Sequence, residues 1–254
     1  MDRSGRSVLK KEPKGTSSMT TAARATRFAP VHRNTLKDQS YSELRRALVT
    51  GRFQPGEHVT VKLLAEQLGS GIMPVREAVQ RLVAEGALVN LPSGRVCVPS
   101  LTRAEFDEII EIRMLLEPHC CRKAAIAMTD AIFAEISEGQ ARLRAAAAGE
   151  NPEAALWANH QYHFGIYRQA GSRQMLALIE SVWLRFGPMM THSQAGGEGA
   201  QDYMDAELKT QEELLAALAA HDGARSAKLM ASIIQRTARW YHKSYPFAEA
   251  VEEF

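Results

Sequence analysis

Two short helix patterns around a glycine turn, between Thr60 and Glu85, constrain the fold of this chain most. Thr60 is a good N-cap for the first helix, whose leucines at positions 63, 64 and 68 share one apolar face. Gly69-Ser70-Gly71 ends that helix, and the second is expected to begin near Pro74, because proline suits a first helical turn. This pattern is typical of a helix-turn-helix, whose second helix enters the major groove of DNA.

The segments on either side predict a winged helix. Residues 41–50 read as a helix with Tyr41, Leu44 and Leu48 on one side, and the turn signal Pro55-Gly56 follows it. Beyond the second helix, residues 87–91 and 96–98 read as two strands around Pro92-Ser93-Gly94-Arg95. We therefore expect a β-hairpin wing with a basic tip.

This stretch resembles the DNA-binding domain of the GntR superfamily of bacterial transcription regulators. The similarity rests on five pieces that stand in the family's order and spacing: Leu44–Leu48, Gly51–Gly56, Leu64–Gly69, Pro74–Leu82 and Glu85-Gly86. The resemblance implies that the second helix reads DNA and that Arg76 contacts it. Arg81 is expected to brace the domain instead.

The chain departs from the family pattern at the start of the second helix. Where the family usually reads Val-Ser-Arg-Thr-Pro, this chain reads Ser70-Gly71-Ile72-Met73-Pro74. Ile72 and Met73 cannot donate a hydrogen bond to guanine, although they can pack on a thymine methyl. We expect DNA binding to an operator unlike the family's common one. The candidate DNA contacts are Arg45, Lys62, Ile72, Met73, Arg76, Gly94 and Arg95.

Composition indicates a cytoplasmic, soluble protein of two domains. The chain has 254 residues, of which 45% are hydrophobic and 24% charged. No apolar run is long enough to span a membrane, and residues 1–37 lack the apolar core of a secretory signal. Its three cysteines form no disulfide framework, which suits a reducing compartment.

Charge is divided unevenly along the chain. Residues 1–100 hold 16 Lys and Arg against 8 Asp and Glu, whereas residues 101–254 hold 15 against 21. This division favours an N-terminal part that faces DNA and an acidic C-terminal part.

Four regions are expected from pattern and composition. Residues 1–37 are basic and rich in Ser and Thr without an apolar period, and predict either a disordered arm that adds phosphate contacts or a solvated tail. Residues 38–100 form the winged helix, 101–245 an all-helical bundle and 246–254 a tail. The predicted fold is mainly α. The bundle's helices are expected at 102–128, 130–148, 152–170, 173–191, 202–220 and 224–241.

The bundle resembles the ligand-sensing FCD domain of the FadR branch of the same superfamily. The matching pieces are Glu111–Pro118, Tyr162–Gly171 and Glu212–Leu218. The resemblance implies a homodimer that binds a palindromic operator, a small-molecule effector and, most commonly in the family, repression that the effector relieves. A repressor is therefore favoured over an activator.

Many domains of this family hold a divalent metal through one Asp and three His, and the equivalent positions here are Asn159, His163, Gln211 and Ile233. Only His163 remains a strong ligand, so a metal cofactor is not expected. A metal would need other ligands, such as His192, Asp202 or His221.

Three interpretations of these positions stay open. They form a polar pocket that binds an organic acid directly through Arg113, Asn159, His163 and Gln211, a polar core without a ligand, or a weakened metal site. Arg113 either captures a carboxylate or pairs with Glu117 four residues later. Trp183, Trp240, Tyr162 and Tyr241 are expected in the core or an interface.

These observations predict a DNA-binding transcription regulator whose helical domain senses a small metabolite. A ligand-independent DNA-binding protein is the first alternative. A metal-assisted enzyme is the second, and it is disfavoured because no intact metal site or nucleophile–base pair is evident. The chain is therefore not expected to be an enzyme.

Overall fold

The computed structural model describes residues 36–196 and 199–249. The predicted arm lies outside these residues except for positions 36 and 37, which are helical rather than disordered. No helix of the described part is long and apolar enough to cross a membrane.

Three helices and a small sheet form the winged helix, in the order that the sequence predicts. The helices are α1 (Leu36–Val49), α2 (Val61–Gln67) and α3 (Ile72–Ala84). Their apolar faces meet in a core that includes Leu44, Leu48, Leu64, Val79 and Leu82, each at most 2% exposed. Thr60 caps α2 by accepting a hydrogen bond from the Leu63 amide, as expected from the sequence.

The helix-turn-helix differs from the prediction at one boundary. Helix α3 begins at Ile72 rather than near Pro74, with Gly71 at the N-cap and no side-chain cap. Pro74 still lies in the first turn, where amide groups have no partner within the helix, so its missing N–H costs nothing. The change places Ile72 and Met73 on the helix itself.

The wing contains three strands, not the two of the predicted hairpin. Strand β3 (Val96–Cys97) lies between β1 (His58–Val59) and β2 (Val89–Asn90), antiparallel to both. His58 pairs with Cys97 on one side of β3, and Val89 pairs with Cys97 on the other. The two-residue strand β1 is too short to show a period in the sequence.

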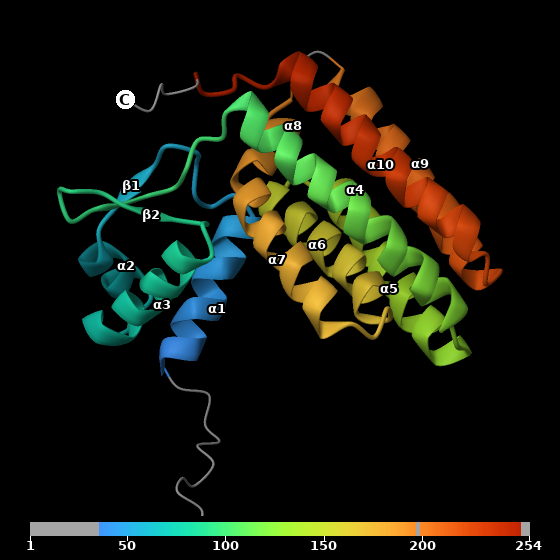
Figure 1. Cartoon of the computed structure of the whole chain (residues 1–254), viewed down its shortest axis with the longest axis horizontal. Helices are drawn as coiled ribbons and strands as arrows, with labels where there is room; N and C mark the ends of the chain where they lie inside the picture. Colours follow the sequence, from blue (N-terminus) through green and yellow to red (C-terminus); the bar gives the residue numbers. More distant parts are fainter. Residues whose placement is uncertain (1–35, 197–198, 250–254) are drawn as a thin grey trace, which may run out of the picture. The chain divides into compact units, whose positions relative to one another are not determined.

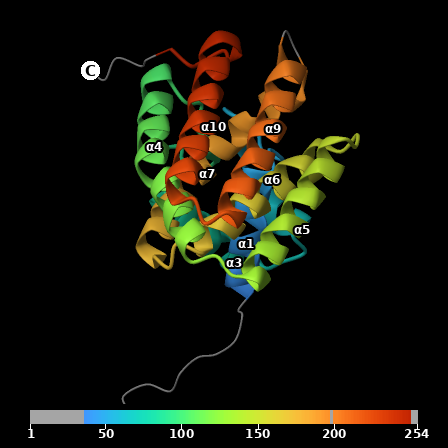
Figure 2. The ribbon, with the colours of Figure 1, turned by 90° about the vertical axis from the view of Figure 1, so that its right-hand side faces the viewer.

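The second part of the chain is a helical bundle (Figure 1). It contains α4 (Arg103–Ile126), α5 (Asp130–Ala147), α6 (Pro152–Arg168), α7 (Arg173–Phe186), α9 (Ala200–Ala219) and α10 (Gly223–Ser244). Thr102 caps α4 in a capping box with Glu105. Figure 2 shows α4 beside α10, and α9 between α10 and α5.

The predicted helix 173–191 is interrupted at Gly187. The chain there turns into a 3-10 helix, η1 (Gly187–Met190), and a short helix, α8 (Thr191–Gln194). A Cβ atom on Gly187 would stand 2.7 Å from the Val49 Cα and 2.8 Å from the Leu48 carbonyl oxygen. Pro188 also lacks the N–H that would continue α7. The close approach of η1 to α1 therefore requires glycine.

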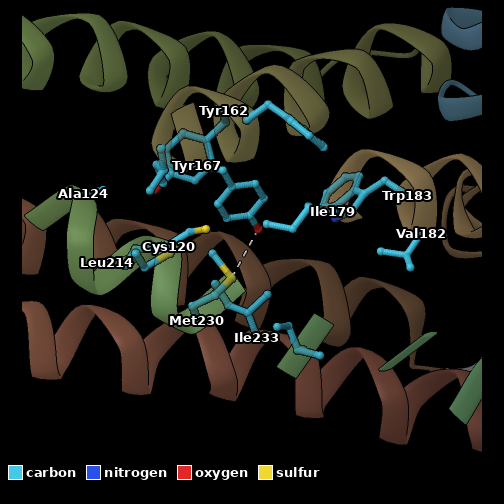
Figure 3. Packing of buried hydrophobic residues seen from close by; sticks show 14 of the residues in the cluster. Cys120, Ala124, Tyr162, Tyr167, Ile179, Val182, Trp183, Leu214, Met230 and Ile233 are labelled. Carbon is cyan, nitrogen blue, oxygen red and sulfur yellow. Dashed lines mark hydrogen bonds between the residues drawn. The ribbon is translucent and has the colours of Figure 1, made fainter. Parts of the chain in front are cut away.

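Large side chains fill the interior of the bundle (Figure 3). Trp183, Tyr162, Tyr167 and Tyr241 are each at most 2% exposed, and Trp240 is half-buried. Ile233 and Met230 point from α10 into this packed region. The prediction that Trp183, Tyr162 and Tyr241 are core residues is confirmed.

Helix α1 packs on the bundle as well as on its own domain. Leu184 of α7 belongs to the same apolar cluster as the winged-helix core. Arg45 pairs with Glu180 of α7 at 3.3 Å, and Arg52 pairs with Glu153 of α6 at 2.6 Å. The guanidinium of Arg46 lies 4.9 Å from the centre of the Trp157 ring. The two domains thus share an interface of apolar and charged contacts.

Candidate functional site

The exposed end of α3 carries three of the predicted DNA contacts. Ile72 and Met73 are 46% and 61% exposed although both are apolar. Arg76, one turn further, is exposed and makes no ion pair or hydrogen bond with the residues that the structure describes. An apolar pair beside an unpaired arginine at a helix N-terminus is suited to thymine methyls and to guanine or phosphate.

Three further predicted contacts, on α2 and in the wing, flank this helix. Lys62 on α2 keeps 79% of its side chain exposed and lies 4.0 Å from Glu66, a weak contact. In the wing, Gly94 has a φ of +77° and nothing within 4 Å of the position of a Cβ. Arg95 beside it is exposed. Both positions are open to a DNA backbone.

Arg45 is a predicted DNA contact whose guanidinium is paired within the described part of the chain. Its guanidinium pairs with Glu180 and also lies 5.5 Å from the centre of the Tyr41 ring. It is therefore engaged at the interface with the bundle. Arg81, in contrast, braces the domain as expected, because it pairs with Glu85 and covers the Tyr41 ring at 3.7 Å.

The bundle encloses a cavity of about 60 Å³ between α4, α5, α6, α7, α9 and α10. All four predicted effector-binding residues line this cavity: Arg113 from α4, Asn159 and His163 from α6, and Gln211 from α9. Ile233 from α10 lines it as well. The structure thus brings together the four positions that the family resemblance singles out.

Arg113 of the cavity wall forms a buried pair with Glu117, which lies behind the wall. The two side chains are 3% and 0% exposed, and Arg113 Nε donates to Glu117 Oε1 at 2.7 Å. Trp183 Nε1 and the Tyr167 hydroxyl donate to the same carboxylate at 2.8 and 2.6 Å. Burial alone would raise the pKa of Glu117, but Arg113 and these donors hold the pKa below its ordinary value.

This pair orients His163 through Tyr167. Because the Tyr167 hydroxyl gives its proton to Glu117, the network assigns the proton of His163 to Nδ1, which donates to the Tyr167 oxygen at 3.1 Å. Burial lowers the pKa of His163 to about 4, so the ring is neutral at pH 7. Its Nε2 therefore accepts, and the Gln211 amide nitrogen lies 3.5 Å from it.

Two polar atoms in the cavity wall have no partner among the described residues. They are Nη1 of Arg113, a donor, and Oε1 of Gln211, an acceptor, and both are fully buried. The Gln211 amide nitrogen is already engaged, since it also donates to Asn159 Oδ1 at 3.3 Å. Buried polar groups are normally paired, so a donor and an acceptor left over in one cavity indicate a missing ligand or water.

Glu207 is a cavity residue that the sequence analysis missed. It is 6% exposed and pairs with Arg236 of α10 at 3.2 Å. Burial raises the pKa of Glu207 to about 7, against the opposing effect of Arg236. It stands four residues before Gln211 on α9, so a helical count from Gln211 would have found it.

The four positions at which the family holds a metal do not fit one here. Asn159 and Gln211 are neutral amides hydrogen-bonded to one another, and Ile233 offers no ligand atom. One neutral imidazole is too few donors for a divalent ion. No group of three or more His, Cys, Asp or Glu with metal-binding geometry occurs within residues 36–196 and 199–249.

The other histidines considered as ligands lie elsewhere. His192 and Asp202 line a separate surface pocket with Arg236 and Trp240. His221 stands at the turn between α9 and α10, where its Nδ1 lies 3.2 Å from the Ala125 carbonyl oxygen. None of the three lines the cavity.

Comparison with known families is consistent with both parts of this arrangement. Residues 36–98 match "Bacterial regulatory proteins, gntR family", and residues 108–236 match "FCD domain", which alone spans half of the chain. The chain belongs to the GntR family. The winged helix of this GntR protein is its DNA-binding domain, and the bundle is its FCD domain.

Related GntR proteins are transcription regulators. McbR of Escherichia coli K12, an HTH-type transcriptional regulator, is 30% identical over 82% of this chain and 93% of its own length. Its solved structure superposes with a TM-score of 0.76 and covers 84% of this chain and 99% of that one. GlaR of the same organism, a transcriptional repressor, is 26% identical over 75% of this chain and 88% of its own. This GntR protein is therefore a transcription regulator and not an enzyme.

Proposed function

We propose that the cavity of this regulator binds a small organic acid without a metal, and that binding changes its affinity for operator DNA. The supporting observation is the unpartnered pair in the cavity wall, Arg113 Nη1 and Gln211 Oε1. An acid with a hydroxyl or amide group offers both partners: a carboxylate oxygen accepts from Arg113, and the second group donates to Gln211.

The charge of the cavity wall limits what the acid can be. Glu117 already offsets the charge of Arg113, and Glu207 faces Arg236 across α9 and α10. A ligand carboxylate is repelled least when Glu207 is protonated. Because the pKa of Glu207 is about 7, its protonation near neutral pH costs little free energy. A monocarboxylate therefore suits the cavity better than a dicarboxylate.

DNA recognition is proposed for Lys62, Ile72, Met73, Arg76, Gly94 and Arg95, with Arg45 excluded because of its contact with Glu180. We further propose a cytoplasmic homodimer on a palindromic operator, since a two-fold dimer presents its two recognition helices to symmetric half-sites. Repression relieved by the effector is the mode we favour, as for the related repressor GlaR.

The test begins with a duplex selected by the purified protein from random-sequence DNA. Fluorescence anisotropy of this duplex is then titrated with small monocarboxylates, hydroxy acids and dicarboxylates. We expect at least one monocarboxylate to change the affinity for DNA, and Gln211→Leu to remove this response while DNA affinity without acid is retained. A response to no acid in the panel, or an unchanged response in Gln211→Leu, would reject the assigned cavity.

A matched control separates the cavity from the protein surface. Gln201 on α9 is exposed, and its Nε2 donates a hydrogen bond to Asp205 on the same helix. Gln201→Leu makes the same substitution on the same helix outside the cavity, and it should leave the response to the acid intact.

A further inference from the structure

A surface pocket lies between the start of α9 and the end of α10. Its volume is about 570 Å³, and sites for small molecules typically measure about 300–1,000 Å³. The cavity inside the bundle measures about 60 Å³, and Tyr203 is the only described residue that lines both spaces. The pocket therefore has room for a larger ligand than the cavity has.

Three basic residues of α10 line this pocket. Arg236, Arg239 and Lys243 are spaced by three and four residues, so they lie on one face of the helix. Arg236 pairs with Glu207 of α9 at 3.2 Å, which offsets its charge. Arg239 and Lys243 are exposed, and neither has an ion pair or hydrogen bond with a described residue. These two cations are therefore available to an anion.

The charge of the pocket is opposite to that of the domain around it. Residues 101–254 hold 15 Lys and Arg against 21 Asp and Glu. Asp202 is the only acid among the described residues that line the pocket, and it faces the two unpaired cations, Arg239 and Lys243. A positive pocket in an acidic domain concentrates anions from solution.

Aromatic side chains stand beside these cations in the pocket wall. Trp240 stacks on Tyr203, with the ring centres 4.8 Å apart and the planes 15° from parallel. The His192 ring lies 5.3 Å from the Trp240 ring. All three rings line the pocket and are partly exposed. Flat aromatic groups next to cations suit a ligand in which a planar ring carries an anionic group.

We propose that this pocket is a second ligand site, which binds a planar ring that carries a carboxylate or a phosphate. Arg239 and Lys243 bind the anionic group, since the arginine offers a fork of donors and the lysine a point charge. The ring packs against Trp240. This site is independent of the acid proposed for the cavity, because the two spaces share only the side chain of Tyr203.

Calorimetric titration of the full-length protein with benzoate, phenyl phosphate and adenosine monophosphate tests the site. Inorganic phosphate lacks the ring and adenosine lacks the charge, so these two compounds are the controls. We expect at least one ring anion to bind with one equivalent per chain, about tenfold or more tightly than either control. Binding of none of the three, or equally tight binding of adenosine, would overturn the proposal.

Substitution of the two cations assigns the binding to this pocket. Arg239→Gln/Lys243→Gln should weaken the ring anion by about tenfold or more. Arg225→Gln/Lys228→Gln removes the same two charges from exposed positions of α10 outside the pocket, and it should leave the affinity unchanged. Unchanged binding in the first variant would place the ligand elsewhere, and equal weakening in both would reduce the effect to net charge. Either result overturns the site.

The contact with the ring is tested at Trp240. Trp240→Leu should weaken the ring anion by about tenfold or more, whereas Trp240→Phe keeps a flat ring and should retain most of the affinity. Circular dichroism confirms that both variants are folded. Equal affinities of the two variants would contradict stacking on Trp240.

Discussion

Replacing Arg113 with methionine should destabilise the protein severely, because it leaves the Glu117 carboxylate buried without its cation. Glu117 is 0% exposed, and Arg113 donates to it at 2.7 and 3.3 Å. Breaking a fully buried pair by removing one partner costs about 3–5 kcal/mol of unfolding free energy. Tyr167 and Trp183 still donate to the carboxylate, so we expect a value near 3 kcal/mol.

The cost should depend on pH with a predictable sign. In the wild type the pKa of Glu117 is lowered, so its contribution to stability is present above the ordinary carboxyl pKa and is lost as pH falls through the folded value. Without Arg113, burial raises the pKa of Glu117, and the variant then loses stability as pH rises. The difference between wild type and Arg113→Met should therefore grow from pH 5 to pH 8.

Urea unfolding followed by circular dichroism at fixed protein concentration measures this difference. The control is the double variant Arg113→Met/Glu117→Gln, which removes both charges and keeps an acceptor for Trp183 or Tyr167. We expect it to be more stable than Arg113→Met at pH 8. A cost of less than about 1 kcal/mol for Arg113→Met at pH 7, or a double variant no more stable than the single one, would refute the role of the buried pair.

Three other outcomes are expected. Arg76→Ala should weaken binding to the selected duplex by about 1–3 kcal/mol in an anisotropy titration, whereas Arg142→Ala, which removes an exposed arginine paired with Glu138, should not. Glu207→Gln should become more stable relative to wild type as pH rises from 5 to 8, by up to about 3 kcal/mol in urea unfolding. The reason is that the pKa of Glu207 in the folded protein, about 7, exceeds the ordinary pKa of a carboxyl group. Equal pH profiles of the two proteins would contradict the effect of burial on Glu207. Elemental analysis of untagged protein should find well under one equivalent of divalent metal, and a full equivalent would refute the substituted-site interpretation.

Local signals predicted most of the helices. Thr102 with Glu105, Asn151 before Pro152 and Asp222 before Gly223 each mark a helix start that the structure contains. The break in α7 was not predictable in this way, because it depends on how closely η1 approaches the backbone of α1 at Gly187. Strand β1 was missed for a similar reason, since its pairing with β3 is a tertiary contact.

The cavity residues were predictable as a set, but their partners were not. The family resemblance pointed to Asn159, His163, Gln211 and Ile233, and all four line the cavity. The sequence did not decide whether Arg113 pairs with Glu117 or captures a carboxylate. In the structure Arg113 pairs with Glu117, and its Nη1 atom has no hydrogen-bond partner among the described residues. The role of Arg45 depended on Glu180, which lies 135 positions later in the chain, and no local pattern links the two.

The position of Leu184 bears on how this protein can be divided. It belongs to the FCD domain by sequence, yet it packs within the apolar cluster of the winged helix. A chain cut near Ser100 would therefore expose part of that cluster to water and leave a gap on α1. The units recognised in sequence are not modular in folding, and a chimera with a foreign sensing domain would need to supply an equivalent of Leu184 and of Gly187.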